Sequence, residues 1–355
     1  MTLYKLVKYN QERFIYIWNK CIISYGCKLS NNCAEDYIDI LPGKNIFKSE
    51  VFDNILECIP KNCDHIFILR PPALGEAYVF VYLYKALLQK FKAKNPCVIV
   101  RVKAQHELLR LYNINSYYID MNLADINRCF EQTEYSYKNR FFHIYPNTIK
   151  ESFRIYREFN INYPEYLKKL YNLNEFTHNK IFFEDSVVNN INKKFQNIDR
   201  NKLIFILPEA KTIKPLNKSF WMDLIQELKD SGYIVYVNSI NNPDFSNFQE
   251  LSISEALYLA SISKCIIGLR SGFVEPISVF NVPMHIIYTD HKYNKGVTST
   301  DILRFSSLKY YPYAKNNIIS EYDNSVCDEL SIKLKIIENI KSMEANNENS
   351  CYNCI

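Results

Sequence analysis

The chain has 355 residues, of which 48% are hydrophobic and 23% charged, and its formal net charge is +5. This length suits two folded domains, and the composition excludes a largely disordered protein. Basic residues are scattered among acidic ones, which argues against a nucleic-acid binder but suits an anionic substrate or the edge of an anionic membrane. Eleven Cys without a framework spacing, no apolar run of membrane-spanning length and no signal-peptide core predict a cytoplasmic protein.

Residues 1–60 are predicted to form a mainly helical extension, with amphipathic helices over Leu3 to Trp18 and Val51 to Cys58. Strand and helix patterns then alternate. The predicted elements are the strand HIFILR, a helix over Leu74 to Phe91, the strand PCVIVRV, the helix AQHELLRLY and the strands SYYIDM and FFHIY. This alternation predicts a parallel sheet covered on both faces, in a domain over residues 61–190.

A polar, helical stretch within residues 150–200 predicts the passage between two domains, and the alternation restarts in a second domain over residues 191–345. Its predicted elements are the strand KLIFILP, a helix over Ser219 to Asp230 closed by Gly232, the strand YIVYVN, the Ser-capped helix SISEALYLASIS and the strand CIIGL. A last helix over Ser331 to Met343 precedes a flexible tail, residues 346–355. The predicted fold class is α/β, with two Rossmann-like domains facing a cleft.

The turn RPPALGE, between the first strand of the first domain and its helix, is a candidate site because open α/β sheets bind ligands at the carboxyl ends of strands. Arg70 opens this turn, and Gly75 allows a ligand or backbone to approach closely. Glu76 can accept a proton from an acceptor hydroxyl as a general base, or it can merely complement the helix dipole. The spacing leaves both roles open.

The loop PEAKTIK directly follows the strand LIFIL and carries Glu209, Lys211 and Lys214. A lysine-bearing loop at the end of a strand can reach a bound diphosphate. The alternative is a solvated loop with ordinary lysines.

The stretch CIIGLRSGFVEPISVFNVPMHIIY predicts a strand, a tight polar turn, a helix and a second strand. A helix that starts after Ser271 and Gly272 would present N–H groups that favour an anion such as a diphosphate, with Arg270 beside it. Phe273 belongs to the same turn, and Glu275 is placed either to hold a sugar hydroxyl or to cap the helix. The alternative is an ordinary connection with Arg270 in solvent.

These three places resemble the heptosyltransferase-like glycosyltransferases of family 9, which have the GT-B fold, over roughly residues 65–290. LRPPALGEAYVF is similar to the family's N-terminal turn, with Glu76 in place of its catalytic Asp. KPLNKSFWMDLIQEL is similar to its Lys-x-Trp-Pro segment, with Lys214 as the donor-phosphate lysine. RSGFVEPISVFNVPMHIIY is similar to its Asp-Thr-Gly-x-x-His loop: Gly272 matches, whereas Arg270 and Glu275 replace Asp and His, as in a divergent branch associated with surface polysaccharides.

The resemblance implies an inverting glycosyltransferase that moves a sugar from a nucleotide-diphosphate donor to a surface-glycan acceptor. Glu76 would be the base, and Lys214, Arg270 and the N–H groups around Ser271 and Gly272 would hold the diphosphate. The acceptor would be a glycan or lipid-linked glycan, met through a peripheral contact at the inner membrane. No cofactor is expected, and the absence of Asp-x-Asp favours a metal-independent reaction. A nucleotide-sugar epimerase of the same fold and a non-catalytic nucleotide-sugar binding protein are the alternatives.

Overall fold

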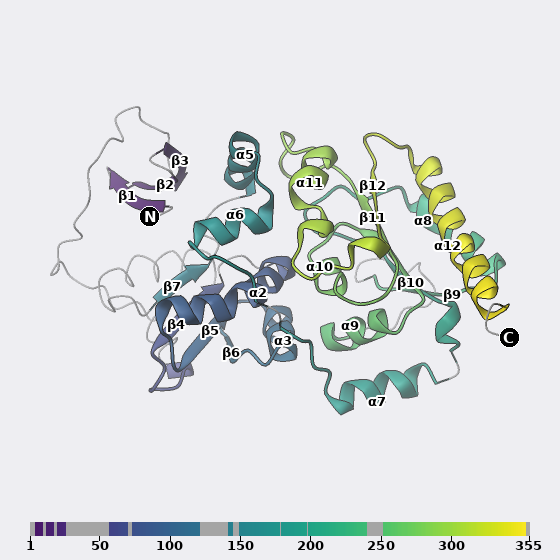
Figure 1. Cartoon of the computed structure of the whole chain (residues 1–355), viewed down its shortest axis with the longest axis horizontal. Helices are drawn as coiled ribbons and strands as arrows, with labels where there is room; N and C mark the ends of the chain where they lie inside the picture. Colours follow the sequence, from purple (N-terminus) through teal and green to yellow (C-terminus); the bar gives the residue numbers. More distant parts are fainter. Residues whose placement is uncertain are drawn as a thin grey trace. The chain divides into compact units, whose positions relative to one another are not determined.

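The computed structural model divides the chain into two compact units, Met1–Phe182 and Phe183–Ile355 (Figure 1). The residues that it describes are 4–9, 12–17, 20–25, 57–69, 73–120, 141–144, 149–177, 179–196, 198–239 and 251–352. The division falls before the boundary that we expected between residues 190 and 191. Helix α7 (Asp185–Lys194) contacts α9 (Ile253–Ser261), so it belongs to the second unit.

The N-terminal segment forms three antiparallel strands, and the helix expected over Leu3 to Trp18 is therefore wrong. The strands are β1 (Tyr4–Tyr9), β2 (Glu12–Ile17) and β3 (Lys20–Tyr25). Their sequences YKLVKY, ERFIYI and KCIISY are rich in aromatic and β-branched residues, which favour strands over helices. The helix expected over Val51 to Cys58 lies almost entirely outside the described residues.

The remainder of the first unit is a parallel sheet of order β6-β5-β4-β7, as the alternation predicts. Its strands are β4 (His65–Leu69), β5 (Pro96–Val100), β6 (Ser116–Tyr118) and β7 (Phe141–Ile144). Its helices are α2 (Leu74–Phe91), α3 (Lys103–Leu111), α5 (Ile149–Phe159) and α6 (Tyr163–Leu170). Every residue of α2 from Ala77 to Leu83 is buried, so this helix is part of the core.

The second unit contains a five-stranded parallel sheet of order β12-β11-β10-β8-β9. Its strands are β8 (Leu203–Leu207), β9 (Ile234–Val237), β10 (Cys265–Leu269), β11 (Met284–Tyr288) and β12 (Ile319–Asp323). All residues of β8, β10 and β11 are buried, which explains why these strands are continuous apolar runs in the sequence. Strand β12 was not expected from the sequence, because this edge strand, ISEYD, carries two acidic residues.

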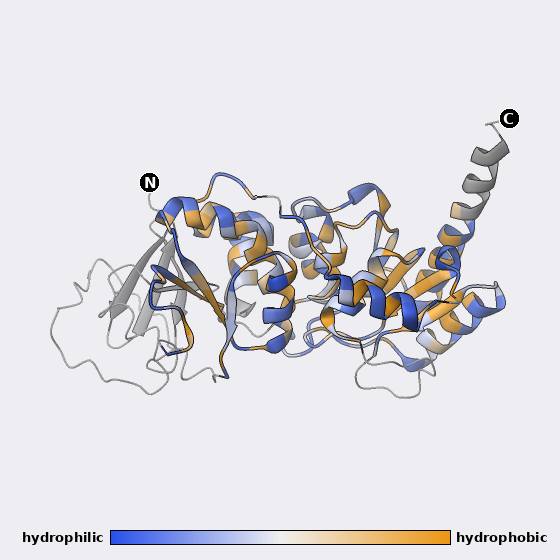
Figure 2. Cartoon of the chain, turned by 90° about the horizontal axis from the view of Figure 1, so that it is seen from below, coloured by the Kyte–Doolittle hydropathy of each residue, from blue (hydrophilic) through white to orange (hydrophobic). Residues whose placement is uncertain are grey.

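Helices cover both faces of this second sheet. They are α7, α8 (Lys218–Asp230), α9, α10 (Val274–Ile277), α11 (Ser299–Ser306) and α12 (Glu329–Tyr352). Helix α8 contacts α12, and α9 contacts α10; right-handed crossovers place these two pairs on opposite faces. In Figure 2 hydrophobic residues gather on the strands and on parts of the helices that cover them. None of the helices in the described part of the chain is long and apolar enough to cross a membrane.

Two predicted helix boundaries are confirmed, and the last helix extends further than we expected. Ser252 Oγ accepts the Glu255 N–H at 3.2 Å and Glu255 Oε2 accepts the Ser252 N–H at 3.0 Å, a reciprocal cap at the start of α9. Gly232 follows α8 with φ of 84°, the left-handed conformation that glycine adopts most easily. At the chain end, α12 continues to Tyr352, through most of the segment expected to be a flexible tail.

Gly268 allows β10 to approach β8 closely just before the sheet edge that carries the candidate site. A Cβ atom at this position would lie 2.7 Å from Leu207 Cβ and 3.0 Å from Leu207 O. We therefore expect Gly268→Ala to lower the free energy of unfolding by about 1–3 kcal/mol in urea titrations. Gly296→Ala is the control, because its Cβ would meet Asn294 Oδ1 at 3.5 Å, an ordinary contact. Equal stability of both variants would contradict the close approach.

Candidate functional site

The second sheet has a topological switch point between β8 and β10. From β8 the chain moves outward to β9, and it then returns to place β10 on the other side of β8. Open α/β sheets bind ligands outside the carboxyl ends of strands at such a point. The loop with Glu209, Lys211 and Lys214 follows β8, and the turn of Ser271 and Gly272 follows β10. The topology thus brings two of the three predicted places to one edge of one sheet.

The lysine loop is hydrogen-bonded to the loop that follows β11, although β10 lies between their strands. The Lys214 N–H donates to Asp290 O at 2.7 Å, and the Lys292 N–H donates to Thr212 O at 2.7 Å. Ile213 forms an antiparallel bridge with His291 between these two bonds. We call this arrangement, residues 212–214 with 290–292, the loop ladder. The two loops meet across the carboxyl end of β10, and their hydrogen bonds fix the backbone of Lys214.

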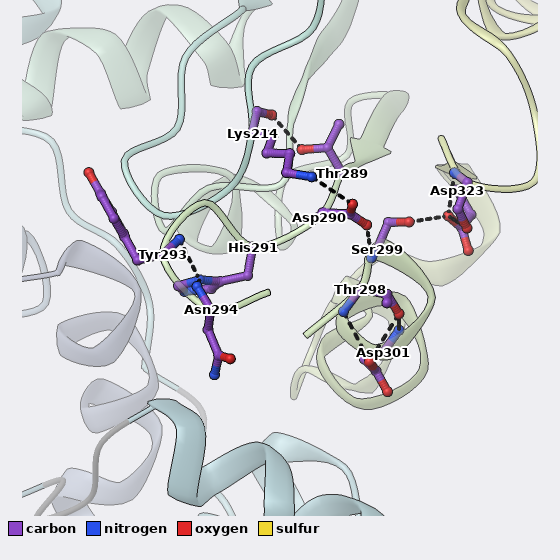
Figure 3. Close-up of polar contacts among 11 residues, drawn as sticks. Lys214, Thr289, Asp290, His291, Tyr293, Asn294, Thr298, Ser299, Asp301 and Asp323 are labelled. Atoms are coloured by element: carbon purple, nitrogen blue, oxygen red, sulfur yellow. Dashed lines mark hydrogen bonds and ion pairs between the residues drawn. The ribbon is translucent and has the colours of Figure 1, made fainter. Parts of the chain in front are cut away.

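Asp290 links the lysine loop to the start of α11 (Figure 3). Its Oδ2 lies 3.0 Å from Lys214 Nζ, and its Oδ1 accepts the Ser299 N–H at 3.0 Å. These contacts, with the Ser299 N–H first and Lys214 next, lower the pKa of Asp290 below its ordinary value. The exposed fractions of the Lys214 and Asp290 side chains are 58% and 40%, so solvent screens this pair. Sequence reasoning missed Asp290 because only the fold brings it to Lys214.

The first turn of α11 is tightly held by other acidic residues. Thr298 Oγ1 accepts the Asp301 N–H at 3.2 Å, and Asp301 Oδ2 accepts the Thr298 N–H at 3.0 Å, a reciprocal cap. Asp323 Oδ1 accepts the Ser299 hydroxyl at 2.6 Å. Figure 3 shows Ser299 between Asp290 and Asp323. The start of α11 is thus a rigid support for the Asp290 carboxylate.

The other two predicted residues of the lysine loop lie differently. Lys211 is exposed, whereas Glu209 is half-buried. The Ser239 hydroxyl donates to Glu209 Oε1 at 2.5 Å, and this contact turns the carboxylate toward the residues that follow β9.

Arg270 and Glu275 bind one another beneath the turn, which corrects the roles expected for both. Arg270 NH2 lies 2.7 Å from Glu275 Oε1, and the exposed side-chain fractions are 7% and 6%. The guanidinium also donates to Ser306 O at 3.1 Å, Ser271 O at 2.9 Å and Tyr311 OH at 2.9 Å. Burial raises the pKa of Glu275, and the Arg270 charge opposes that rise. Instead of meeting a diphosphate, Arg270 ties the turn to the residues at the end of α11.

The turn itself offers backbone donors but no long helix. Helix α10 has four residues, so the expected helix dipole at the turn is wrong. Within the part of the chain that the structure describes, no atom accepts a hydrogen bond from the N–H groups of Ser271, Gly272 or Phe273. All three residues are half-buried. Successive N–H groups of this kind can donate to an anion without any helix behind them.

The first sheet has its own switch point, between β4 and β7, and Glu76 follows β4 in the first turn of α2. Glu76 is half-buried and Gly75 is buried, while Arg70 lies outside the described residues. Gln105 Nε2 donates to Ala73 O at 2.8 Å and thereby holds the chain that enters α2. Sequence reasoning missed this buried glutamine.

The Glu76 carboxylate acts electrostatically on Tyr156 in α5. Burial raises the pKa of Tyr156 above its ordinary value, and the charge of Glu76 raises it further.

His291 shapes the loop after β11. Its Nδ1 accepts the N–H groups of Tyr293 at 3.1 Å and Asn294 at 2.9 Å, so the ring proton of the neutral form is on Nε2. Burial lowers the pKa of His291, which keeps the ring neutral near pH 7. Among the described residues, no group of three or more His, Cys, Asp or Glu could hold a metal ion.

No family model and no curated protein matches the sequence. Among solved structures, E. coli ADP-heptose LPS heptosyltransferase II matches with a TM-score of 0.51 and 14% identity, over 79% of this chain and 99% of that chain. A family 9 glycosyltransferase from Veillonella parvula matches with a TM-score of 0.52 and 12% identity, over 80% and 98%.

The chain has the fold of these two glycosyltransferases. TM-scores of 0.51 and 0.52 over 79% and 80% of this chain show a shared fold, which confirms the predicted α/β class with Rossmann-like units.

Proposed function

We propose that this protein is a glycosyltransferase that moves a sugar from a nucleotide-diphosphate donor to a glycan acceptor. The observation that carries the proposal is the switch point of the second sheet, where Lys214 and the N–H groups of Ser271 and Gly272 follow adjacent strands. A diphosphate has the negative charge and the acceptor oxygens that such a place binds. The fold shared with two glycosyltransferases supports the same class of reaction.

In the proposed reaction, Glu76 takes the proton of an acceptor hydroxyl while the hydroxyl oxygen attacks the anomeric carbon. The bond between that carbon and the phosphate oxygen breaks, and the nucleoside diphosphate leaves with the bonding electrons. A single displacement of this kind inverts the configuration at the anomeric carbon. Lys214 and the N–H groups of Ser271 and Gly272 stabilise the charge on the leaving diphosphate, which is the part of the reaction that a metal ion would otherwise serve.

Glu209, Lys211 and Phe273 complete the proposed donor site in the second unit. The proposed acceptor is a growing surface glycan, free or lipid-linked. The net charge of +5 suits a peripheral contact with the anionic inner face of a membrane. Flotation with anionic lipid vesicles measures this contact, and a chain that stays entirely in the unbound fraction would exclude it.

The test of the reaction is incubation of the protein with a panel of nucleotide sugars and candidate acceptors. Nucleotide release that depends on the acceptor, with a product of inverted configuration, is the expected result. A donor sugar that is isomerised without an acceptor would identify an epimerase instead. Tight donor binding without turnover of any kind would identify a binding protein.

Lys214→Met is expected to weaken the binding of a nucleoside diphosphate by roughly 10- to 150-fold, because a charged hydrogen-bond donor to phosphate is lost. Isothermal titration calorimetry measures this change. The control is Lys229→Met, an exposed lysine in the last turn of α8 that removes the same charge away from the site. If both variants bind equally well, Lys214 does not contact the phosphates.

A further inference from the structure

The Asp290 carboxylate lies where an anion bound by Lys214 would lie. Its Oδ2 is 3.0 Å from Lys214 Nζ, about the distance at which an ammonium group binds a phosphate oxygen. In the protein without ligand, the negative charge of Asp290 therefore already balances the positive charge of Lys214. A diphosphate that reaches Lys214 has to share this ammonium group with Asp290 or replace Asp290 on it.

Asp290 is the fixed member of the pair. Its Oδ1 accepts the Ser299 N–H at the start of α11, and its main-chain oxygen accepts the Lys214 N–H in the loop ladder. The start of a helix also favours a negative charge. Lys214 has a flexible four-carbon stem and a side chain that is 58% exposed, so its ammonium group can turn toward a ligand while Asp290 stays in place.

We propose that Asp290 is a built-in counter-charge that weakens the hold of Lys214 on a diphosphate. Asp290 thereby lowers the affinity for the nucleoside diphosphate and favours its release after transfer. This inference deepens the proposed function and rests on it. It makes Asp290 a residue that sets how tightly the leaving group is bound, and not a residue that binds the leaving group.

Two opposing effects decide whether removal of the Asp290 charge strengthens or weakens the binding of a diphosphate. A carboxylate about 5 Å from a phosphate charge, in a partly solvated site, repels it enough to change affinity roughly tenfold. Loss of the Asp290 charge would also free the Lys214 side chain, and this would weaken the binding. Because an exposed ion pair holds a lysine only weakly, this second effect changes the affinity by less than roughly fivefold. Repulsion is the larger effect, so removal of the charge should tighten the binding of a diphosphate.

The test is a calorimetric titration of the full chain with inorganic pyrophosphate and with nucleoside diphosphates. Asp290→Asn removes the charge and keeps an oxygen for the Ser299 N–H. We expect it to lower the dissociation constant of pyrophosphate by roughly fivefold or more. Asp301→Asn is the matched control, because Asp301 lies in the first turn of α11, whose Ser299 N–H Asp290 accepts, but bonds to Thr298 instead of Lys214. This control should leave the dissociation constant nearly unchanged.

Equal or weaker binding of pyrophosphate to Asp290→Asn would overturn the inference. Equal tightening in Asp301→Asn would overturn it too, since the effect would then follow net charge alone. If no variant binds any pyrophosphate, Lys214 is not an anion site and the inference fails. Pyrophosphate contains no sugar or nucleoside, so this result is separate from turnover. Tightening without sugar transfer would reject the proposed function alone, whereas transfer without tightening would reject the counter-charge alone.

Discussion

Glu76→Gln is expected to lower the rate of sugar transfer by roughly 100- to 10,000-fold, the range that a positioned general base contributes. Glutamine keeps the size of the side chain but cannot take a proton from the acceptor hydroxyl. The affinity for the donor should stay unchanged, because the proposed donor site belongs to the second unit. Steady-state rates with saturating donor and acceptor, together with donor titrations, measure the two quantities separately.

Glu158→Gln is the matched control for Glu76→Gln. Glu158 is an exposed glutamate of α5 in the same unit, so the control makes the same chemical change at a residue that has no role in the proposed reaction. Transfer at the wild-type rate in Glu76→Gln would leave Glu76 as a partner of the helix dipole only. That role affects helix stability by roughly 0.3–1 kcal/mol, and it would leave the proposed reaction without its base.

Arg270→Met is expected to lower the free energy of unfolding by about 3–5 kcal/mol, because it leaves the buried Glu275 carboxylate without its cation. Chemical denaturation monitored by circular dichroism measures this loss. The double variant Arg270→Met/Glu275→Leu should recover most of the stability, since apolar residues then fill the space of the ion pair. An exposed phosphate-binding arginine would instead show lost donor affinity with stability unchanged.

The stability loss in Arg270→Met should depend on pH in a defined direction. Burial raises the pKa of Glu275, and without Arg270 only the hydrogen bond from the Tyr311 hydroxyl opposes that rise. A carboxyl group whose pKa is higher in the folded state than in the unfolded state destabilises the fold as pH rises through that interval. The variant should therefore be closest to wild type at acidic pH and weakest near neutral pH. A loss that is the same at every pH would contradict an uncompensated carboxylate.

Much of the fold could be predicted from the sequence, because the signals are local. The helix over Leu74 to Phe91 and the apolar strands β8 and β10 follow from runs of buried residues, and Gly232 marks the end of α8 by its own conformation. The strands β1, β2, β3 and β12 were not expected. Strands β1 and β2 lie where the amphipathic pattern favours a helix, and the polar edge strand β12 does not have the apolar run that buried strands show.

The candidate site could be predicted only in part, because its contacts join residues that are far apart in the sequence. Lys214 was found from its place after a strand, but its partner Asp290 is 76 positions away. The polar turn at Arg270 looks the same in sequence whether its cation faces a ligand or a buried carboxylate. The available signal was Glu275 itself, an acidic residue in the otherwise apolar run VEPI.

The loop ladder limits how donor preference can be changed by exchanging loops between related enzymes. Residues 212–214 obtain their backbone partners from residues 290–292, which belong to a loop on a non-adjacent strand. A graft of one loop alone keeps these bonds only if the new backbone places its N–H and C=O groups where the old loop had them. Residues 212–214 and 290–292 should therefore be exchanged together when a chimera of two related enzymes is built.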